Sequence, residues 1–353
     1  MHDVITIGTG TRDVFLFSPL FKVLRDKKHL KKIGFATGEA QCFALGGKIE
    51  IGKPVFATGG GANNSATTFS RQGLKTAALM KIGADEAGQS ILNELKNEKV
   101  DIISRPGRDM MNGTAYSTVL LAPEGERTIL VYRGISENLS EKEISFNKLK
   151  SKWAYVSPGK ISFETISKIF NHFHKNKILI AFNPSKHFIE MGIKKIKPLL
   201  NKSKVVILNR EEASYLTGVD YEKEKEIFKK LDEAVDGITV MTDGEKGVLV
   251  SDCCNIYKAK IFKEQKVVDR TGAGDAFGSG FVAGLIQKRE NCRKGLCGID
   301  NVEYAIRLGS ANATSVIEQI GAKAGILTKE EFEKNKRWNK LEIKKLCCNP
   351  IKK

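Results

Sequence analysis

The chain has 353 residues, of which 41% are hydrophobic and 28% are charged, and its formal net charge is +17. No stretch approaches the roughly 20 apolar residues of a membrane-spanning helix, and the start MHDVITIGTG lacks the basic-then-apolar order of a signal peptide. The excess charge is mostly scattered Lys rather than clustered Arg, which argues against base-reading nucleic-acid contacts and predicts a cytoplasmic protein with a solvated basic surface.

Short apolar runs followed by helix-like segments recur along the chain. The runs that we predict to be strands are VITIG (4–8), KTAALMKIG (75–83), WAYVSP (153–158), ILIAFNPS (178–185), KVVILNR (204–210) and GITVMTDG (237–244). Continuous apolar strands that alternate with helices indicate an α/β fold with a doubly wound, mostly parallel sheet flanked by helices. In such sheets ligands bind beyond the carboxyl ends of the strands.

Two regions interrupt this rhythm, because their strand-like pieces have no helices after them. We expect residues 14–58 and 105–134 to form a small β-rich lid over the site, whose outer face could pair with a second copy of the chain. The divisions that follow are a core of residues 1–13, 59–104 and 135–346, and a basic tail at 347–353.

The strongest chemical signal is the run DRTGAGDAF (269–277). We expect a strand to end near Asp269, a turn at Gly272, Ala273 and Gly274, and a helix from about Asp275. Glycines let backbone N–H groups approach an anion closely, and a helix N-terminus adds partial positive charge. The pattern predicts an anion hole for a transferring phosphoryl group, with Asp275 beside it as the base.

Two considerations bear on Asp275 itself. The helix N-terminus is expected to lower its pKa and weaken it as a base, which phosphoryl transfer through a loose transition state tolerates. The competing interpretation is a glycine turn with Asp275 as a simple N-cap.

Other motifs give no rival site. The chain has no G-x-x-x-x-G-K-[ST] and no H-R-D, and Asp13 stands where a dinucleotide fingerprint needs its third glycine. The seven cysteines are odd in number and include no C-x-x-C, so they predict neither a disulfide framework nor a zinc site.

The run VVDRTGAGDAFGSGFVAGLI (267–286) resembles the C-terminal signature of the ribokinase-like (PfkB) carbohydrate kinases. Residues 59–101 resemble the N-terminal signature, and TRD (11–13), NREEASYLTG (209–218) and TDGEKGVLV (242–250) follow in the family's order. The resemblance implies ATP-dependent phosphorylation of a sugar or nucleoside hydroxyl with Mg²⁺, and frequently with a monovalent cation such as K⁺.

Site residues carry over from the resemblance position by position. On the substrate side it implies that Asp13 and Asn64 grip hydroxyls while Gly59 and Gly60 let the backbone approach the sugar. Asn63 competes with Asn64 and could instead cap the helix. On the nucleotide side the implied residues are Asn209, Glu212 (a Mg²⁺ ligand through water), Thr242, Gly244, Asn312 against adenine, and Asp269 near the monovalent cation.

The substrate stays open. A sugar is favoured over a nucleoside of the adenosine or inosine type. A phosphosugar is the third option, since lid arginines could bind a second phosphate: Arg105, Arg108, Arg127 and Arg133. The alternative from another class is a nucleotide-responsive binding protein without turnover, in whose favour the basic charge speaks.

Overall fold

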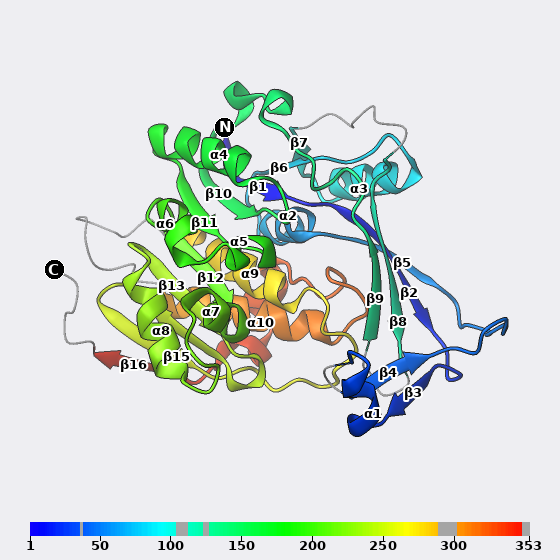
Figure 1. Cartoon of the computed structure of the whole chain (residues 1–353). Helices are drawn as coiled ribbons and strands as arrows, with labels where there is room; N and C mark the ends of the chain where they lie inside the picture. The colour runs from blue at the N-terminus through cyan, green and yellow to red at the C-terminus, as the bar shows by residue number, and fades with distance from the viewer. Residues whose placement is uncertain (36–37, 104–111, 123–126, 289–301, 348–353) are drawn as a thin grey trace.

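A computed structural model describes residues 1–35, 38–103, 112–122, 127–288 and 302–347 (Figure 1). Its centre is a ten-stranded sheet in the order β16-β15-β14-β13-β12-β11-β10-β1-β6-β7. The strands from β7 to β13 are parallel to their neighbours, and β14 to β16 are added antiparallel. The predicted α/β class and mostly parallel sheet are therefore confirmed.

The strands of this sheet follow the apolar runs closely. Their bounds are β1 His2–Gly8, β6 Thr76–Met80, β7 Asp101–Ile102, β10 Ser151–Ser157, β11 Leu179–Phe182, β12 Val205–Asn209, β13 Ile238–Thr242, β14 Val248–Ser251, β15 Asn255–Ala259 and β16 Ile343–Cys347. All five residues of β6 are buried, as expected of a parallel strand covered on both faces.

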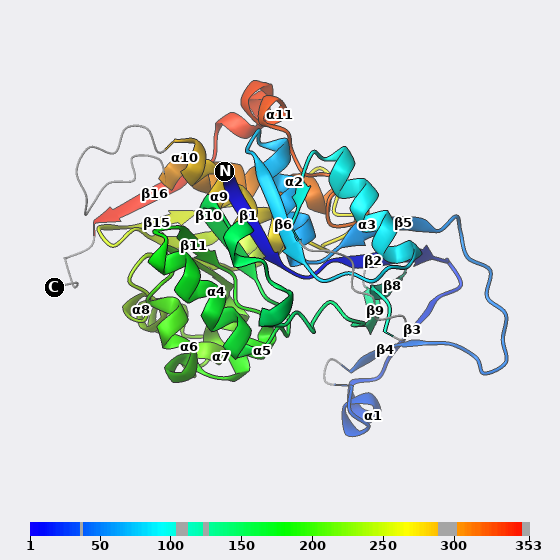
Figure 2. The same ribbon diagram turned by 90° about the horizontal axis from the view of Figure 1, so that it is seen from above.

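Helices cover both faces of the sheet, and Figure 2 shows the two layers. One core joins the sheet to α4 Phe163–Lys175, α5 Lys186–Glu190, α6 Ile193–Leu200, α7 Arg210–Thr217 and α8 Glu224–Glu233. On the other face lie α2 Gly61–Arg71, α3 Glu86–Asn97, α9 Ala273–Gln287, α10 Val302–Ile317 and α11 Lys329–Lys334.

Local sequence explains these helices. In α4, Ser162 caps the N-terminus by accepting a hydrogen bond from Thr165 N, and the buried Ile166, Ile169, Phe170 and Phe173 recur at helical spacing. By contrast, α9 is apolar on nearly all sides, because it is buried between the sheet and α10.

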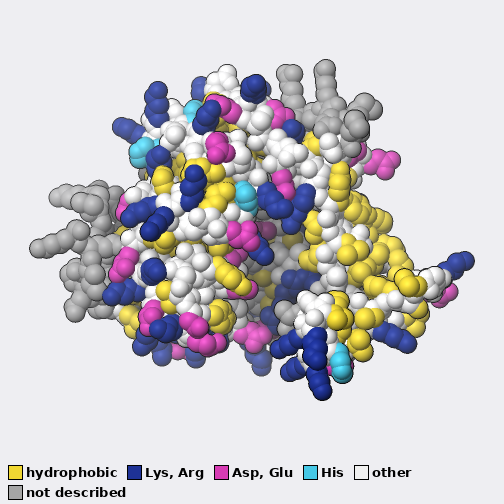
Figure 3. Space-filling view, viewed as in Figure 1, with side chains coloured by type: hydrophobic (Ala, Val, Ile, Leu, Met, Phe, Trp, Pro, Cys, Tyr) yellow, Lys and Arg dark blue, Asp and Glu magenta, His cyan; other side chains and the backbone are white. Residues whose placement is uncertain are grey.

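A second, four-stranded sheet lies beside the core in the order β5-β2-β8-β9. Its strands are β2 Thr11–Phe17, β5 Val55–Gly59, β8 Ala115–Leu121 and β9 Arg127–Tyr132. The hairpin of β3 Lys22–Arg25 and β4 Glu39–Cys42, with α1 Lys27–Lys32 between its strands, extends from it. Figure 3 shows a hollow between this part and the core, and hydrophobic side chains gathered over β8 and β9.

The position of Asp13 differs from the expectation. The division by sequence places it in the core, at the end of residues 1–13, but it lies inside β2 of the smaller sheet, opposite Ala57 of β5. The chain leaves β1 at Gly8 and enters β2 at Thr11, so only two residues separate the sheets.

The prediction of a strand that ends near Asp269 is wrong, because residues 260–272 contain no strand. The N–H groups of Val268 and Asp269 donate instead to the carbonyl of Ile317 at the end of α10. This segment is thus held by loop hydrogen bonds rather than by a neighbouring strand.

Residues 343–347 form the edge strand β16 against β15, so Cys347 of the expected basic tail belongs to the sheet. Residues 348–353, the rest of the expected tail, lie outside the described part of the chain. Cys254 is disulfide-bonded, contrary to the expectation from the cysteine pattern. Among the described residues, no helix is both long and apolar enough to cross a membrane.

Candidate active site

A hydrogen bond joins the two signature motifs of the sequence, residues 59–101 and 267–286. Asn64 Nδ2 donates to Asp275 Oδ2 at 2.8 Å, across 211 residues of chain. Asn64 lies in the first turn of α2 and Asp275 in the first turn of α9, and the two helices pack against each other. The two motifs therefore form one site at the N-termini of neighbouring helices.

The glycine turn before α9 has the geometry that an anion needs. Gly272 is the N-cap with φ +79°, and a Cβ there would lie 2.4 Å from Ala322 Cβ, so only glycine fits. A Cβ on Gly274 would have no atom within 4 Å, so this glycine faces open space. The first N–H groups of a helix lack intrahelical partners and can bind an anion. In this turn Ala273 N makes a long hydrogen bond of 3.4 Å to Arg270 O.

The helix begins at Ala273, two residues before the predicted start, so Asp275 is its third residue and not its cap. Its pKa also differs from the expectation. Burial raises the pKa of Asp275 above its usual value, and the hydrogen bond from Asn64 opposes this only in part. A carboxylate whose pKa lies nearer to neutrality is a better proton acceptor.

Glu212 lies near Asp275 and forms a reciprocal cap with Asn209 at the start of α7. Asn209 Oδ1 accepts from Glu212 N at 2.8 Å, while Glu212 Oε2 accepts from Asn209 N at 2.9 Å. Burial, partly offset by the hydrogen bond from Asn209, and the negative charge of Asp275 raise the pKa of Glu212 to about 7.

Because the charge of Asp275 opposes ionisation of Glu212, a cation near these two carboxylates would favour their charged forms. Among the described residues, no group of three or more His, Cys, Asp or Glu could hold a metal. Mg²⁺ sites commonly use one or two carboxylates, water and substrate phosphates rather than an all-protein cage.

A cavity of about 360 Å³ opens beside the turn on the nucleotide side. The predicted residues Asn209, Thr242 and Gly244 line it together with Gly274. Sheet register explains their convergence, because Asn209 and Thr242 are opposite each other at the carboxyl ends of β12 and β13. The walls are largely apolar and include Val248, Ile261, Phe277, Ala313 and Ile317.

Charged side chains that the sequence did not assign complete this side. Arg270 also lines the cavity. Its Nη2 lies 2.9 Å from Glu245 Oε1. The buried Arg210 Nη1 lies 2.8 Å from Asp243 Oδ2 and so fixes the turn after β13 to α7. An Arg at the first position of a helix gives no sequence signal of this role.

Asp13 lies against Gly59, the last residue of the strand that leads to α2. A Cβ on Gly59 would be 2.1 Å from Asp13 Oδ2, so this carboxylate needs glycine in β5. Thr11 Oγ1 donates to Asp13 Oδ1 at 3.0 Å, and burial raises the pKa of Asp13. Gly60, with φ +94°, is the N-cap of α2, so Asn63 is not the cap; its amide donates to Thr58 and Gly59 inside the fold.

Two predicted nucleotide-side residues have other surroundings. Asn312 is fully buried and does not line the cavity, although Ala313 does. Its amide donates to Ala276 O at 2.8 Å and accepts from Leu327 N at 3.0 Å, so it holds α9 and α10 to the loop after α10. Asp269 is buried, and its oxygens accept from Thr271 and from Gly321 N.

The arginines considered for a second phosphate receive no support. Arg105 and Arg108 lie outside the described residues. Arg133 Nη1 lies 3.5 Å from Glu137 Oε1, and Arg127 begins β9 at its half-buried end.

Comparison with known proteins gives a consistent result. The model of the "pfkB family carbohydrate kinase" matches residues 27–329. The chain is 29% identical over 277 residues to a cytidine kinase of Thermococcus kodakarensis, covering 76% of this chain and 91% of that protein. It is 26% identical to a ribokinase of Haemophilus influenzae, covering 78% and 86%.

The fold has solved counterparts as well. A probable sugar kinase from Rhizobium etli superposes with a TM-score of 0.74 at 22% identity, covering 94% of this chain and 98% of that one. At this identity the likeness concerns the fold alone.

The pKa of Glu212 predicts how stability depends on pH. Because burial raises it from an ordinary 4.5 to about 7, the native state holds an extra proton between these values. The free energy of unfolding of the ligand-free protein should then fall as pH rises from about 5 to about 7. Glu212→Gln should remove this part of the fall, as urea unfolding across that range without Mg²⁺ would measure.

The matched control is Glu190→Gln, which changes an exposed glutamate of α5 and should keep the slope of the unmodified protein. Equal slopes in the unmodified protein and Glu212→Gln would contradict the assignment.

Proposed function

The chain belongs to the pfkB family of carbohydrate kinases, and we propose that it transfers the γ-phosphoryl group of ATP to a hydroxyl of a sugar. The family's named members are phosphotransferases that act on sugar or nucleoside hydroxyls. The finer assignments, which are the substrate, the base, the phosphate turn and the cations, are our proposal.

The observation that carries it is the hydrogen bond between Asn64 and Asp275. Asn64 holds the Asp275 carboxylate beside the open turn at Gly274, where an acceptor hydroxyl and a phosphoryl group would meet. Asp275 then accepts the hydroxyl proton while the N–H groups of residues 272–275 stabilise charge on the phosphoryl oxygens.

The sugar and the nucleotide occupy opposite sides of this point. Asp13 accepts hydrogen bonds from sugar hydroxyls, and Gly59 and Gly60 admit the sugar to the backbone. The apolar cavity beside Thr242 and Gly244 takes the adenine, and the phosphates extend toward Gly274.

Cations complete the proposal. Mg²⁺ would be held through water by Glu212 and by the phosphates, and when bound it neutralises charge on the transferring group. The monovalent cation K⁺ is assigned to the loops that Asp269 orders. Because both Asp269 oxygens already accept hydrogen bonds, this residue would shape the cation loop through Thr271 and Gly321.

The smaller sheet is the proposed lid, formed by residues 14–58 and 105–134. Closure over the sugar would exclude water and limit hydrolysis of ATP. Residues 104–111 and 123–126 lie outside the described part, so the argument rests on β2, β5, β8 and β9. We also propose a cytoplasmic location, where ATP is available.

A nucleoside kinase is the second candidate, and the similarity to a cytidine kinase supports it. A nucleoside presents a ribose hydroxymethyl to the same base, so the catalytic residues would not change. The non-enzymatic alternative, a nucleotide-responsive binding protein, has only the net charge in its favour.

The central test measures ADP release over a panel of sugars, phosphosugars and nucleosides, in K⁺ and in tetramethylammonium buffer. One substrate class should be phosphorylated, faster in K⁺. Asp275→Asn should lower kcat by at least roughly 10²-fold, the low end of general-base contributions. Asp269→Asn should weaken the K⁺ response. Turnover unchanged by Asp275→Asn would refute the base, and salt-sensitive duplex DNA binding without ADP release would favour the binding protein.

The phosphate turn is tested by two neighbouring glycines. Gly274→Ala should fold normally, because its Cβ enters open space, yet lower kcat by roughly 10²-fold, as loss of an oxyanion contact does. Gly272→Ala should instead destabilise the fold by at least ~1 kcal/mol, because φ +79° and Ala322 both exclude a side chain. Thermal unfolding and kinetics separate the two effects, and full activity of Gly274→Ala would contradict the turn's role.

We propose a homodimer formed through the lid, because β9 is an edge strand with exposed apolar residues on both faces. Light scattering should give about twice the 39.0 kDa of one chain. Leu130→Lys should yield monomers, since Leu130 is 56% exposed in β9, whereas Leu346→Lys on the edge strand β16 should leave the dimer intact. A monomeric unmodified protein would end this part of the proposal.

A further inference from the structure

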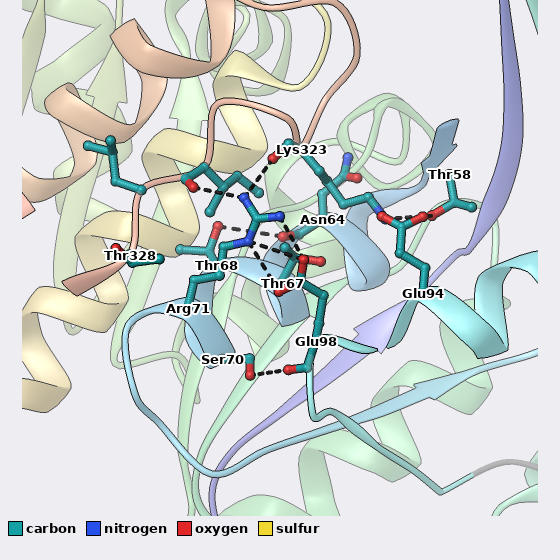
Figure 4. Close-up of polar contacts among 12 residues, drawn as sticks. Thr58, Asn64, Thr67, Thr68, Ser70, Arg71, Glu94, Glu98, Lys323 and Thr328 are labelled. Atoms are coloured by element: carbon teal, nitrogen blue, oxygen red, sulfur yellow. Dashed lines mark hydrogen bonds and ion pairs between the residues drawn. The ribbon is translucent and has the colours of Figure 1, made fainter. Parts of the chain in front are cut away.

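A buried lysine lies behind the sugar side of the site. The Lys323 side chain is 5% exposed, and its Nζ lies 2.6 Å from Glu94 Oε1. It also donates to Thr58 Oγ1. Figure 4 shows these side chains meeting between α2, α3 and the loop after α10.

Thr58 connects this cluster to the residues proposed to hold the sugar. Its hydroxyl donates to Glu94 Oε2 at 2.7 Å and accepts from Asn63 Nδ2 at 2.8 Å. Thr58 directly precedes Gly59, against which the Asp13 carboxylate lies, and β5 is an edge strand of its sheet. Lys323 thus fixes the strand that supports Asp13.

The loop of Lys323 also supports the phosphate turn. Ala322 packs on Gly272, and Gly321 N donates to Asp269 Oδ2 at 3.0 Å. The backbone of the same loop is fastened to α2, because Arg71 Nη1 donates to the carbonyls of Lys323 and Ile326 at 3.1 and 2.9 Å.

We propose that Lys323 is a positioning residue that joins the sugar-binding strand β5 to the phosphate turn at Gly272. The loop contacts the turn through Ala322 and the strand through the Lys323 ammonium, so neither can shift without the other. This inference rests on the proposed function, in which Asp13 binds the sugar.

Fold stability alone gives little reason for this arrangement. Burying an ammonium is costly, and burial lowers the pKa of Lys323 while Glu94 opposes that shift. Replacing a buried ion pair with apolar residues of similar size is often neutral or stabilising. A charged pair at this position is therefore better explained by its effect on the site.

The charge of Lys323 also acts on Asp13 across β5. Burial raises the pKa of Asp13, and the positive charges facing it that lower its pKa are Lys323 and Arg12. Glu94 and Glu98 face Lys323 and weaken its effect. Without Lys323, Asp13 would take up a proton at higher pH and bind hydroxyls less well.

The test uses Lys323→Met and the double variant Lys323→Met/Glu94→Met, which leaves no uncompensated buried charge. We expect both to raise the sugar KM about tenfold, to leave the ATP KM within about twofold, and to shift the acidic limb of kcat/KM for the sugar to higher pH. The double variant should recover most of the Tm lost in the single variant.

Lys81→Met is the matched control, because Lys81 is a second largely buried lysine and its Nζ lies 2.8 Å from Glu143 Oε1. It should lower the Tm but leave the sugar KM unchanged. The proposal is overturned when the double variant recovers both Tm and sugar KM, or when folded Lys323→Met keeps the normal KM.

A readout without turnover separates this inference from the proposed function. The carboxyl carbon of Asp13, followed by NMR in the substrate-free protein, should titrate at higher pH in Lys323→Met than in the unmodified protein. An unchanged titration overturns the electrostatic part of the inference. A normal sugar KM in Asp13→Asn would instead refute the proposed sugar contact, whatever the titration shows.

Discussion

The hydrogen bond between Asn64 and Asp275 is the contact on which the site depends, because it requires the N-termini of α2 and α9 to meet. That meeting requires bare backbone at Gly60 and Gly272, both with positive φ. It also places the glycine turn beside the cavity that Asn209 and Thr242 line. Helix packing of α2 on α9 thus decides where chemistry can occur, and the strands only bring the helices to that place.

The carboxylates of the site are buried or partly buried. Burial raises the pKa of Asp13, Glu212 and Asp275, so ionisation of each carboxyl group costs more free energy than it does in water. Positive groups offset this cost unevenly. The charge of Lys323 lowers the pKa of Asp13, whereas the charge of Asp275 raises the pKa of Glu212 further.

Much of the fold could be predicted because parallel strands appear in the sequence as continuous apolar runs. One example is KVVILNR (204–210), which contains β12 and its last residue Asn209. Predictions failed where long-range contacts decide. The run before the turn is apolar like a strand, yet its N–H groups bond to Ile317 at the end of α10. Asn312 lies in the predicted helix, but one helical position separates a cavity wall at Ala313 from a fully buried amide.

The sequence by itself determined the α/β class, the glycine turn and the identity of the residues that meet around it, because motifs and periodicity are local properties of the chain. Only the tertiary structure decided that Asp13 belongs to the smaller sheet, that burial raises the pKa of Asp275, and that Lys323 is buried against Glu94 and Thr58. Burial and charge proximity arise from segments hundreds of residues apart, so no local pattern records them.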